Sequence, residues 1–264
     1  MIGVIVSYWA ARSPRCLYRL LDQIYRHDAG AEFTVTVVCN GGDIAPLRLP
    51  ARHVRRGVRT LNRENAGYNI GAWDFGWRSD PDSDYFLFLQ DECLIRNNGW
   101  LRAFVNAMEA DPRVGLLGEN INWRCTWETQ RNNPIAARCL NRDDEEPFNS
   151  VDFLHDFIES LGIPPGDSAD HLQSLVLFAS RKVLESIDGF PSGSTYAEAV
   201  GTEVAISKSV QAHGYRMAMV GDRPFTYIGH RQWTDEWYKR WIRLKLFLRP
   251  YKGRLEQWLA RRTV

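Results

Sequence analysis

Residues 85–92 read Tyr-Phe-Leu-Phe-Leu-Gln-Asp-Glu, a short apolar run that ends at a glutamine and two carboxylates. A continuous apolar run of this length, bounded by polar residues, is typical of a strand buried on both faces. Residues 2–8, 33–39 and 114–118 form further runs of the same kind, with helical patterns between them. The sequence therefore predicts an α/β fold with a mostly parallel sheet flanked by helices. Such sheets bind ligands beyond the carboxyl ends of their strands.

Capping residues and apolar spacing predict the helices and the remaining strands. Ser13 as N-cap and Pro14 at the first helical position start a helix that runs to about His27. The polar stretch 119–170 lacks periodicity and is predicted to be a loop-rich insertion or lid. The other predicted elements are helices over 99–111, 181–187 and 202–213, and strands over 172–179 and 216–220.

Composition excludes several classes of protein. Of the 264 residues, 44% are hydrophobic and 25% charged, which is ordinary for a globular domain, and the net charge of +1 gives no sign of nucleic-acid binding. No apolar run approaches the ~20 residues of a transmembrane helix, and no secretory leader opens the sequence. The 5 cysteines contain no C-x-x-C pair, which argues against zinc and disulfides and favours a reducing cytoplasm.

The last part of the sequence is basic and aromatic. Residues 231–264 contain ten Lys or Arg and three acids, whereas residues 142–170 are strongly acidic. Trp237, Trp241, Leu244 and Leu248 recur at helical spacing with basic residues beside them. This pattern predicts a basic amphipathic helix, with peripheral contact to an anionic membrane through 234–264. The alternative is that the apolar stripe packs against the rest of the protein.

Two groups of residues follow predicted strands and are candidates for ligand binding. Asp91 and Glu92 end the 85–89 strand, where two carboxylates could hold a divalent cation; a solvated acidic turn is the alternative. The loop at 63–74 has glycines at 67 and 71 among asparagines, which suits either a phosphate-facing turn or a plain turn and helix cap. It matches neither the dinucleotide-binding nor the P-loop pattern.

Two further candidates lie in the second half. Glu198 and Glu203 stand ahead of and at the start of the predicted 202–213 helix, where an acid either does chemistry or favours the helix dipole. His230 follows the last short strand and is either a ligand or a packed histidine.

Taken together, this order of elements and motifs resembles that of the GT-A (Rossmann-like) glycosyltransferases, especially glycosyltransferase family two and its bacterial rhamnosyl- and O-antigen-type members. The resemblance covers about residues 2–230. It implies a catalytic domain over 1–230, with a nucleotide-sugar-binding half at 1–118 and an acceptor-binding half at 119–230. Residues 231–264 would then form a C-terminal basic helical extension.

The resemblance also implies roles for individual residues. Cys39 replaces an acid that hydrogen-bonds uracil in the family, and Gln90 replaces the first acid of the metal motif. The general base, eleven residues before Gly214-Tyr215, falls on Glu203. The implied metal ligands are Asp91, Glu92 and His230. The implied donor-binding residues are Ser7, Tyr8, Asn40, Asn65, Gly67, Asn69, Gly71, Gln90 and Asp91.

These matches imply an inverting, Mg²⁺- or Mn²⁺-dependent glycosyltransferase of bacterial surface polysaccharide assembly. The donor would be a nucleotide sugar and the acceptor a saccharide or lipid-linked hydroxyl, with the protein in the cytoplasm or at the inner face of the membrane. One alternative is a sugar-nucleotide-processing enzyme, although the glycine-rich loop that such an enzyme needs after its first strand is missing here. The other is a non-catalytic carbohydrate- or nucleotide-binding protein on a degenerate GT-A fold.

Overall fold

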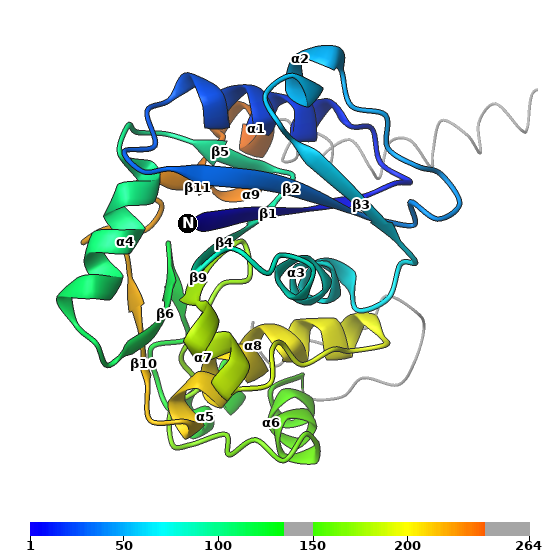
Figure 1. Cartoon of the computed structure of the whole chain (residues 1–264). Helices are drawn as coiled ribbons and strands as arrows, with labels where there is room; N and C mark the ends of the chain where they lie inside the picture. The colour runs from blue at the N-terminus through cyan, green and yellow to red at the C-terminus, as the bar shows by residue number, and fades with distance from the viewer. Residues whose placement is uncertain (135–149, 241–264) are drawn as a thin grey trace, which may run out of the picture.

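The computed structural model describes residues 1–134 and 150–240 of the chain. Its centre is a sheet of seven strands (Figure 1). One strand, β9, is antiparallel to both of its neighbours, and every other neighbouring pair in this sheet is parallel. In their order across the sheet, the strands are β10 (Arg216–Met219), β6 (Val114–Gly118), β9 (Val176–Ser180), β4 (Tyr85–Gln90), β1 (Ile2–Trp9), β2 (Phe33–Asn40) and β3 (Arg59–Arg63).

Helices and two small sheets complete the described part of the chain. β5 (Cys93–Ile95) pairs with β11 (Ile228–His230), and β7 (Ile121–Asn122) pairs with β8 (His171–Leu172), both antiparallel. The helices are α1 (Arg15–Arg26), α2 (Ala51–Val54), α3 (Tyr68–Arg78), α4 (Trp100–Ala110), α5 (Trp127–Arg131), α6 (Ser150–Ser160), α7 (Arg181–Ser186), α8 (Tyr196–Ala212) and α9 (Arg231–Thr234).

Both faces of the sheet are buried, as predicted. Successive residues of a strand point to opposite faces, so Val4 and Val6 pack with α1 and α4, whereas Ile5 packs with α3, α7 and α8. Figure 1 shows this arrangement, with α1 on one side of the sheet and α3 and α8 on the other. The prediction of a mostly parallel α/β sheet flanked by helices is confirmed.

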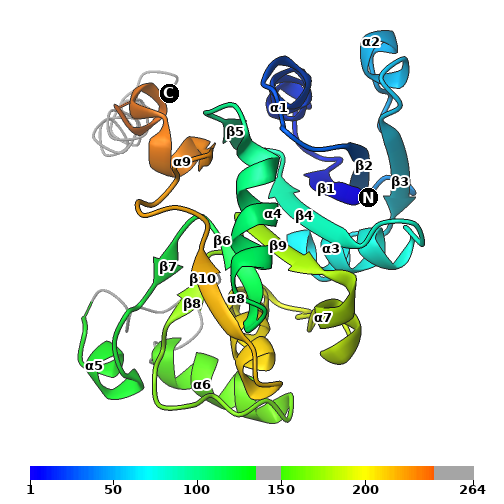
Figure 2. The same ribbon diagram turned by 60° about the vertical axis from the view of Figure 1, so that its left-hand side comes forward.

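The described residues of the predicted insertion, 119–134 and 150–170, contain more regular structure than predicted. The loop-rich interpretation was wrong for α6, whose Val151 and Ile158 pack with Val204 and Ala205 of α8. Figure 2 shows α5 and α6 together at one end of the molecule, with α9 and β5 at the opposite end. The acidic residues of this stretch obscured the helical spacing of its few apolar residues.

Two predicted boundaries were also wrong. The helix predicted over 202–213 begins at Tyr196, because Thr195 and Glu198 form a capping box at its start. Gly201 lies inside this helix and not before it, and a Cβ there would come within 2.4 Å of the Phe157 ring on α6. Helix α1 begins at Arg15, with Pro14 rather than Ser13 at the cap position.

The strand predicted over 172–179 is two strands, β8 and β9. Its middle residues bond elsewhere, because the N–H groups of Gln173 and Ser174 donate to Asn120 and to Glu203. Of the predicted C-terminal helix, residues 236–240 are helical, whereas 241–264, with Trp241, Leu244 and Leu248, lie outside the described residues. Within 1–134 and 150–240, no helix has both the length and the apolar character needed to cross a bilayer.

Candidate active site

A cavity of about 430 Å³ opens where β1, β2 and β4 end. The three ends meet because the strands are parallel and in register, with Ser7 beside Gln90 and Trp9 beside Asn40. Seven of the nine predicted donor-binding residues line this cavity: Ser7, Tyr8, Asn40, Asn65, Asn69, Gln90 and Asp91. Four further lining residues escaped the sequence analysis: Trp9, Arg12, Tyr68 and Tyr196.

Ser7 and Tyr8, near the end of β1, line the cavity, and hydrogen bonds fix both side chains. The Ser7 hydroxyl donates to the carbonyl of Leu89 at 3.3 Å, and the Tyr8 hydroxyl donates to the carbonyl of Arg12. Burial, with smaller contributions from Cys39 and Asp91, raises the pKa of Tyr8 to about 12. Tyr8 is therefore a neutral phenol at physiological pH.

The loop before α3 forms one wall and is fastened to the end of β2. The Asn40 amide donates to the carbonyl of Tyr68 at 2.6 Å. Gly67 has a φ of 67°, which favours glycine, and a Cβ on Gly71 would lie 2.5 Å from the carbonyl oxygen of Ala66. The path of the loop therefore requires glycine at both positions. Neither glycine is among the residues that line the cavity.

Asp91 and Glu92 have different surroundings. Asp91 is 8% exposed, and burial, together with the neighbouring Glu92, raises its pKa to about 6. Among the residues described, no cation lies within ion-pair distance of the Asp91 carboxylate. The Glu92 carboxylate, in contrast, lies 3.3 Å from Arg12 and 3.9 Å from Arg231.

His230 reaches this region through the pairing of β11 with β5, which places it opposite Cys93. It is 2% exposed, and burial lowers its pKa to about 4, so the ring is neutral. Its Nδ1 accepts the backbone N–H of Gln232 at 3.3 Å, which places the ring proton on Nε2. This tautomer suits a hydrogen-bond donor, whereas a metal ligand at Nε2 would need the proton on Nδ1. The metal role of His230 stays a prediction.

Glu203 lies outside the cavity and is connected to it by Ser174. One Glu203 oxygen accepts the Ser174 N–H at 2.8 Å and the Ser174 hydroxyl at 2.5 Å, and the other lies 3.5 Å from His171. The Ser174 carbonyl in turn accepts the amides of Gln90 at 2.7 Å and Asn69 at 3.1 Å. One residue thus connects Glu203 to two predicted donor-binding side chains.

The hydrogen bonds of Glu203 also set its charge. Burial raises its pKa, but the hydrogen bonds from His171 and Ser174 outweigh burial and hold the pKa below its ordinary value. Glu203 is therefore a carboxylate at neutral pH, with 21% of its side chain exposed. Glu198, the other candidate, accepts the N–H groups of Ser194 and Thr195 and closes the capping box.

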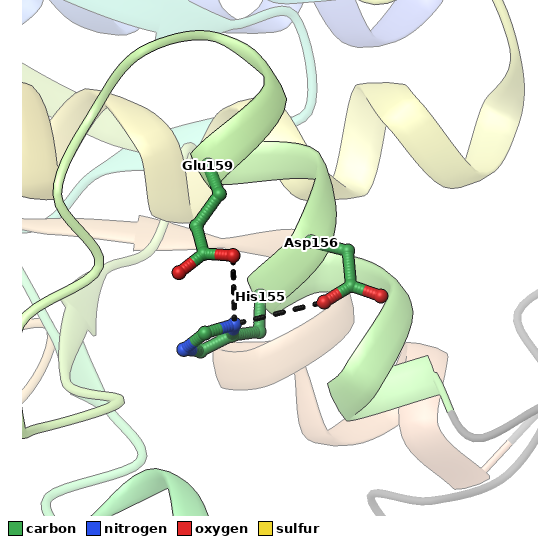
Figure 3. Close-up of side chains that lie close together, drawn as sticks. All are labelled: His155, Asp156 and Glu159. Atoms are coloured by element: carbon green, nitrogen blue, oxygen red, sulfur yellow. Dashed lines mark ion pairs between the residues drawn. The ribbon is translucent and has the colours of Figure 1, made fainter.

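A separate group of possible metal ligands lies on α6. Within the described ranges, His155, Asp156 and Glu159 are the residues whose ligand atoms converge, and His155 Nδ1 lies 3.7 and 3.9 Å from the two carboxylates (Figure 3). Asp156 is 80% exposed and Glu159 is 57% exposed. Helix α6 contributes no residue to the cavity, and Asp91, Glu92 and His230 do not converge in this way.

Besides the four lining residues named above, one of which is Arg12, the sequence analysis missed Ser174 and His171. Arg12 follows the first strand directly, so its position beyond a carboxyl end was a usable signal. Ser174 and His171 carried none, because the reversal of the chain between β8 and β9 places them here.

The fold and cavity define an α/β protein with a cavity at the carboxyl ends of neighbouring strands of its sheet. No family model and no curated protein sequence matches the chain. Among solved structures, it is similar to the mannosyltransferase PcManGT from Pyrobaculum calidifontis in complex with GDP-Man and Mn²⁺, at 18% identity and a TM-score of 0.49, over 84% of this chain and 55% of that one. It is also similar to S. aureus TarS residues 1–349 in complex with UDP-GlcNAc, at 14% identity and a TM-score of 0.47, over 86% and 57%.

The chain thus spans little more than half the length of these two structures, and 36% of a longer TarS structure. At these identities and TM-scores the similarity concerns the general course of the chain, and no residue role is taken from it.

Proposed function

We propose that this protein is an inverting GT-A glycosyltransferase that moves a sugar from a nucleotide-sugar donor to a hydroxyl of a saccharide or lipid-linked acceptor in bacterial surface polysaccharide assembly. The observation that supports this best is the cavity at the ends of β1, β2 and β4. It gathers seven residues that were assigned to donor binding from the sequence alone. These residues come from four separate segments of the chain, at 7–8, 40, 65–69 and 90–91.

Asp91 fits a divalent cation better than the other two predicted ligands. Its carboxylate is buried at the cavity without an ion-pair partner among the described residues, and burying an unpaired carboxylate is costly. Glu92 would have to share its carboxylate with Arg12 and Arg231, and His230 would have to change its tautomer. A bound Mg²⁺ or Mn²⁺ would supply positive charge beside the leaving diphosphate.

Glu203 is the proposed general base. In a single displacement, the acceptor oxygen bonds to the anomeric carbon while the bond from that carbon to the diphosphate oxygen breaks, and the acceptor proton passes to the carboxylate. Ser174 holds this carboxylate at a fixed position relative to Asn69 and Gln90. Fixed positioning of base and donor is itself a large part of such catalysis.

Binding and turnover with an Asp91→Asn variant test the proposal. We expect wild-type protein to bind UDP or GDP more tightly with Mn²⁺ than with chelator in calorimetry, and to release the nucleoside diphosphate from a nucleotide sugar. Asp91→Asn should lose the Mn²⁺-dependent part of its nucleotide affinity, whereas Asp82→Asn, which alters an exposed residue before β4, should behave as wild type. Equal Mn²⁺-dependent affinity in a folded Asp91→Asn variant would refute the metal assignment.

The hydrogen bonds of Glu203 favour one alternative, a non-catalytic binding protein on the same fold. A carboxylate with a lowered pKa that already accepts two hydrogen bonds from Ser174 is a weaker proton acceptor. Such a protein would bind nucleoside diphosphates and release none from a nucleotide sugar, with or without added acceptors. Turnover in the same experiment therefore separates the two functions.

A further inference from the structure

A second cavity, of about 640 Å³, lies on the other side of the Asp91-Glu92 pair. We call it the arginine pocket, because four arginines line it: Arg12, Arg15, Arg19 and Arg231. Asp91 and Arg12 line both cavities, so the two adjoin. The cavity at the ends of β1, β2 and β4 is lined by one arginine, whereas the arginine pocket is lined by four.

Of the four arginines, Arg12 and Arg231 lie within ion-pair distance of a carboxylate in the described structure, and they share the same one, Glu92. Glu92 accepts from Arg12 at 3.3 Å and lies 3.9 Å from Arg231, which is also stacked over the Tyr238 ring at 4.2 Å. In the described part of the chain, Arg15 and Arg19 form no ion pair. Arg15 and Arg19 therefore carry positive charges that no ion pair within the described residues compensates, and arginines outnumber carboxyl groups by four to two in the lining.

The position of these two arginines is unfavourable without a further group. They lie four residues apart on α1, where like charges repel, and in the first turns of a helix whose dipole is positive at that end. No acidic residue occurs in the first turn of α1. The repulsion between the arginines and the unfavourable interaction with the helix dipole are each small, and both are destabilising. An anion bound in the pocket would offset both, because it attracts the two arginines and interacts favourably with the positive end of the helix.

Arg19 is the strongest indication of a ligand. Its Nε and one terminal nitrogen, Nη2, are buried and have no hydrogen-bond partner in the described structure. A buried polar group without a partner is destabilising, and that cost is larger when the group is charged. Nε and Nη2 belong to the planar fork of the guanidinium, which pairs with two oxygens of one anion.

We propose that the arginine pocket binds a phosphoryl group. A phosphate ester offers several acceptor oxygens and one to two negative charges, which matches the two uncompensated arginines and the adjacent Ser13. The group could belong to the donor diphosphate, through the shared Arg12, or to a phosphate on a second substrate. The inference goes beyond the proposed function and does not require glycosyl transfer.

Calorimetric titration with inorganic pyrophosphate, in chelator and at low salt, tests the pocket without any metal. We expect wild-type protein to bind, and Arg19→Gln to bind about ten- to a hundredfold more weakly, since charge-assisted hydrogen bonds are lost. Arg26→Gln is the matched control: it removes the same charge from an exposed position at the other end of α1. Equal affinity of wild type and Arg19→Gln, or an equal loss in Arg26→Gln, would overturn the proposal.

Two further measurements keep the test decisive. Arg15→Gln alters an exposed side chain, so it serves if Arg19→Gln does not fold, and it should also weaken pyrophosphate binding. Without ligand, the Tm of Arg19→Gln should equal or exceed that of wild type, because an uncompensated buried charge is gone. A lower Tm together with unchanged binding would show that Arg19 serves packing alone, against the proposal.

Competition then identifies the source of the phosphoryl group. With UDP or GDP and Mn²⁺ bound, continued binding of pyrophosphate assigns the pocket to a second substrate, whereas displacement assigns it to the donor; both results support a phosphoryl site. Asp91→Asn removes a negative charge from the lining of the arginine pocket, so in chelator it should bind pyrophosphate at least as tightly as wild type, and failure of the proposed function leaves this test intact. Loss in Asp91→Asn but not in Arg19→Gln would overturn the arginine pocket.

Discussion

Glu119 connects the end of β6 to the segment that carries His230, and its charge should control stability at neutral pH. It is 2% exposed, and one of its oxygens accepts the N–H groups of Tyr227 at 3.0 Å and Ile228 at 2.6 Å. The other oxygen has no partner among the described residues. Burial raises the pKa of Glu119 to about 7, although these backbone hydrogen bonds oppose it.

The size of the effect follows from the pKa. The ordinary value is 4.5 and the folded value is about 7, a difference that corresponds to roughly 3 kcal/mol. Because the folded pKa is the higher one, this contribution to stability is complete below pH 4.5 and is lost as the pH rises through about 7. Between pH 5 and pH 8, the free energy of unfolding should fall by roughly 2–3 kcal/mol through Glu119 alone.

Glu119→Gln removes the titration and keeps a carbonyl that can accept both N–H groups. Urea unfolding of wild type and variant at pH 5, 6.5 and 8 measures the difference, in which every other titrating group cancels. We expect the variant to gain roughly 2–3 kcal/mol relative to wild type between the first and last pH. The exposed Glu109→Gln should follow wild type. A constant difference between Glu119→Gln and wild type over this range would refute the reasoning.

Two further predictions concern the candidate active site. Glu203→Gln should lower turnover by roughly 10²–10⁴-fold and leave donor affinity nearly unchanged. Glu198→Gln keeps an oxygen for the capping box and loses only the charge near the helix N-terminus, so it should cost roughly 0.3–1 kcal/mol of stability with turnover intact. Steady-state kinetics with thermal unfolding checks both, and the reverse pattern would show that the base is misassigned. Gly71→Ala places a Cβ 2.5 Å from the Ala66 carbonyl oxygen, so it should cost roughly 1–3 kcal/mol and weaken nucleotide binding. An unchanged Tm and nucleotide affinity in Gly71→Ala would contradict this prediction, because the loop would then accommodate the Cβ without cost.

The strands predicted at 2–8, 33–39, 85–89 and 114–118 are mostly buried, and such strands must be nearly continuous apolar runs; the edge strand β10 was also predicted, although it is largely unburied. β3 was missed because it pairs with β2 alone at the edge of the sheet, so its sequence, Arg-Thr-Leu-Asn-Arg, carries no such run. The start of α8 was missed although the Thr195-x-x-Glu198 signature was present, and the helix was predicted to begin only at 202, after Gly201. Its actual role, close approach to Phe157, depends on a helix that the sequence did not predict.

For the site, register explains what could be predicted. Ser7, Asn40 and Gln90 end neighbouring parallel strands, so their meeting follows from the strand assignment alone. The arginine pocket could not be foreseen, because it needs the pairing of β11 with β5 to carry Arg231 back beside Glu92. Contacts of that kind depend on the tertiary path of the chain, which apolar spacing does not encode.

The direction of β9 determines how the cavity is connected to Glu203. In a fully parallel sheet, this strand would present its carboxyl end beside those of β1 and β4. Because β9 is antiparallel, Val176 at its amino end pairs with Leu89 at the carboxyl end of β4. The residue just before the strand pair, Ser174, therefore arrives at the cavity edge with its carbonyl toward Gln90 and its hydroxyl toward Glu203. The antiparallel strand thus connects Glu203, the proposed base, to Gln90, a proposed donor-binding residue, through Ser174, and such fixed positioning is what the proposed transfer requires.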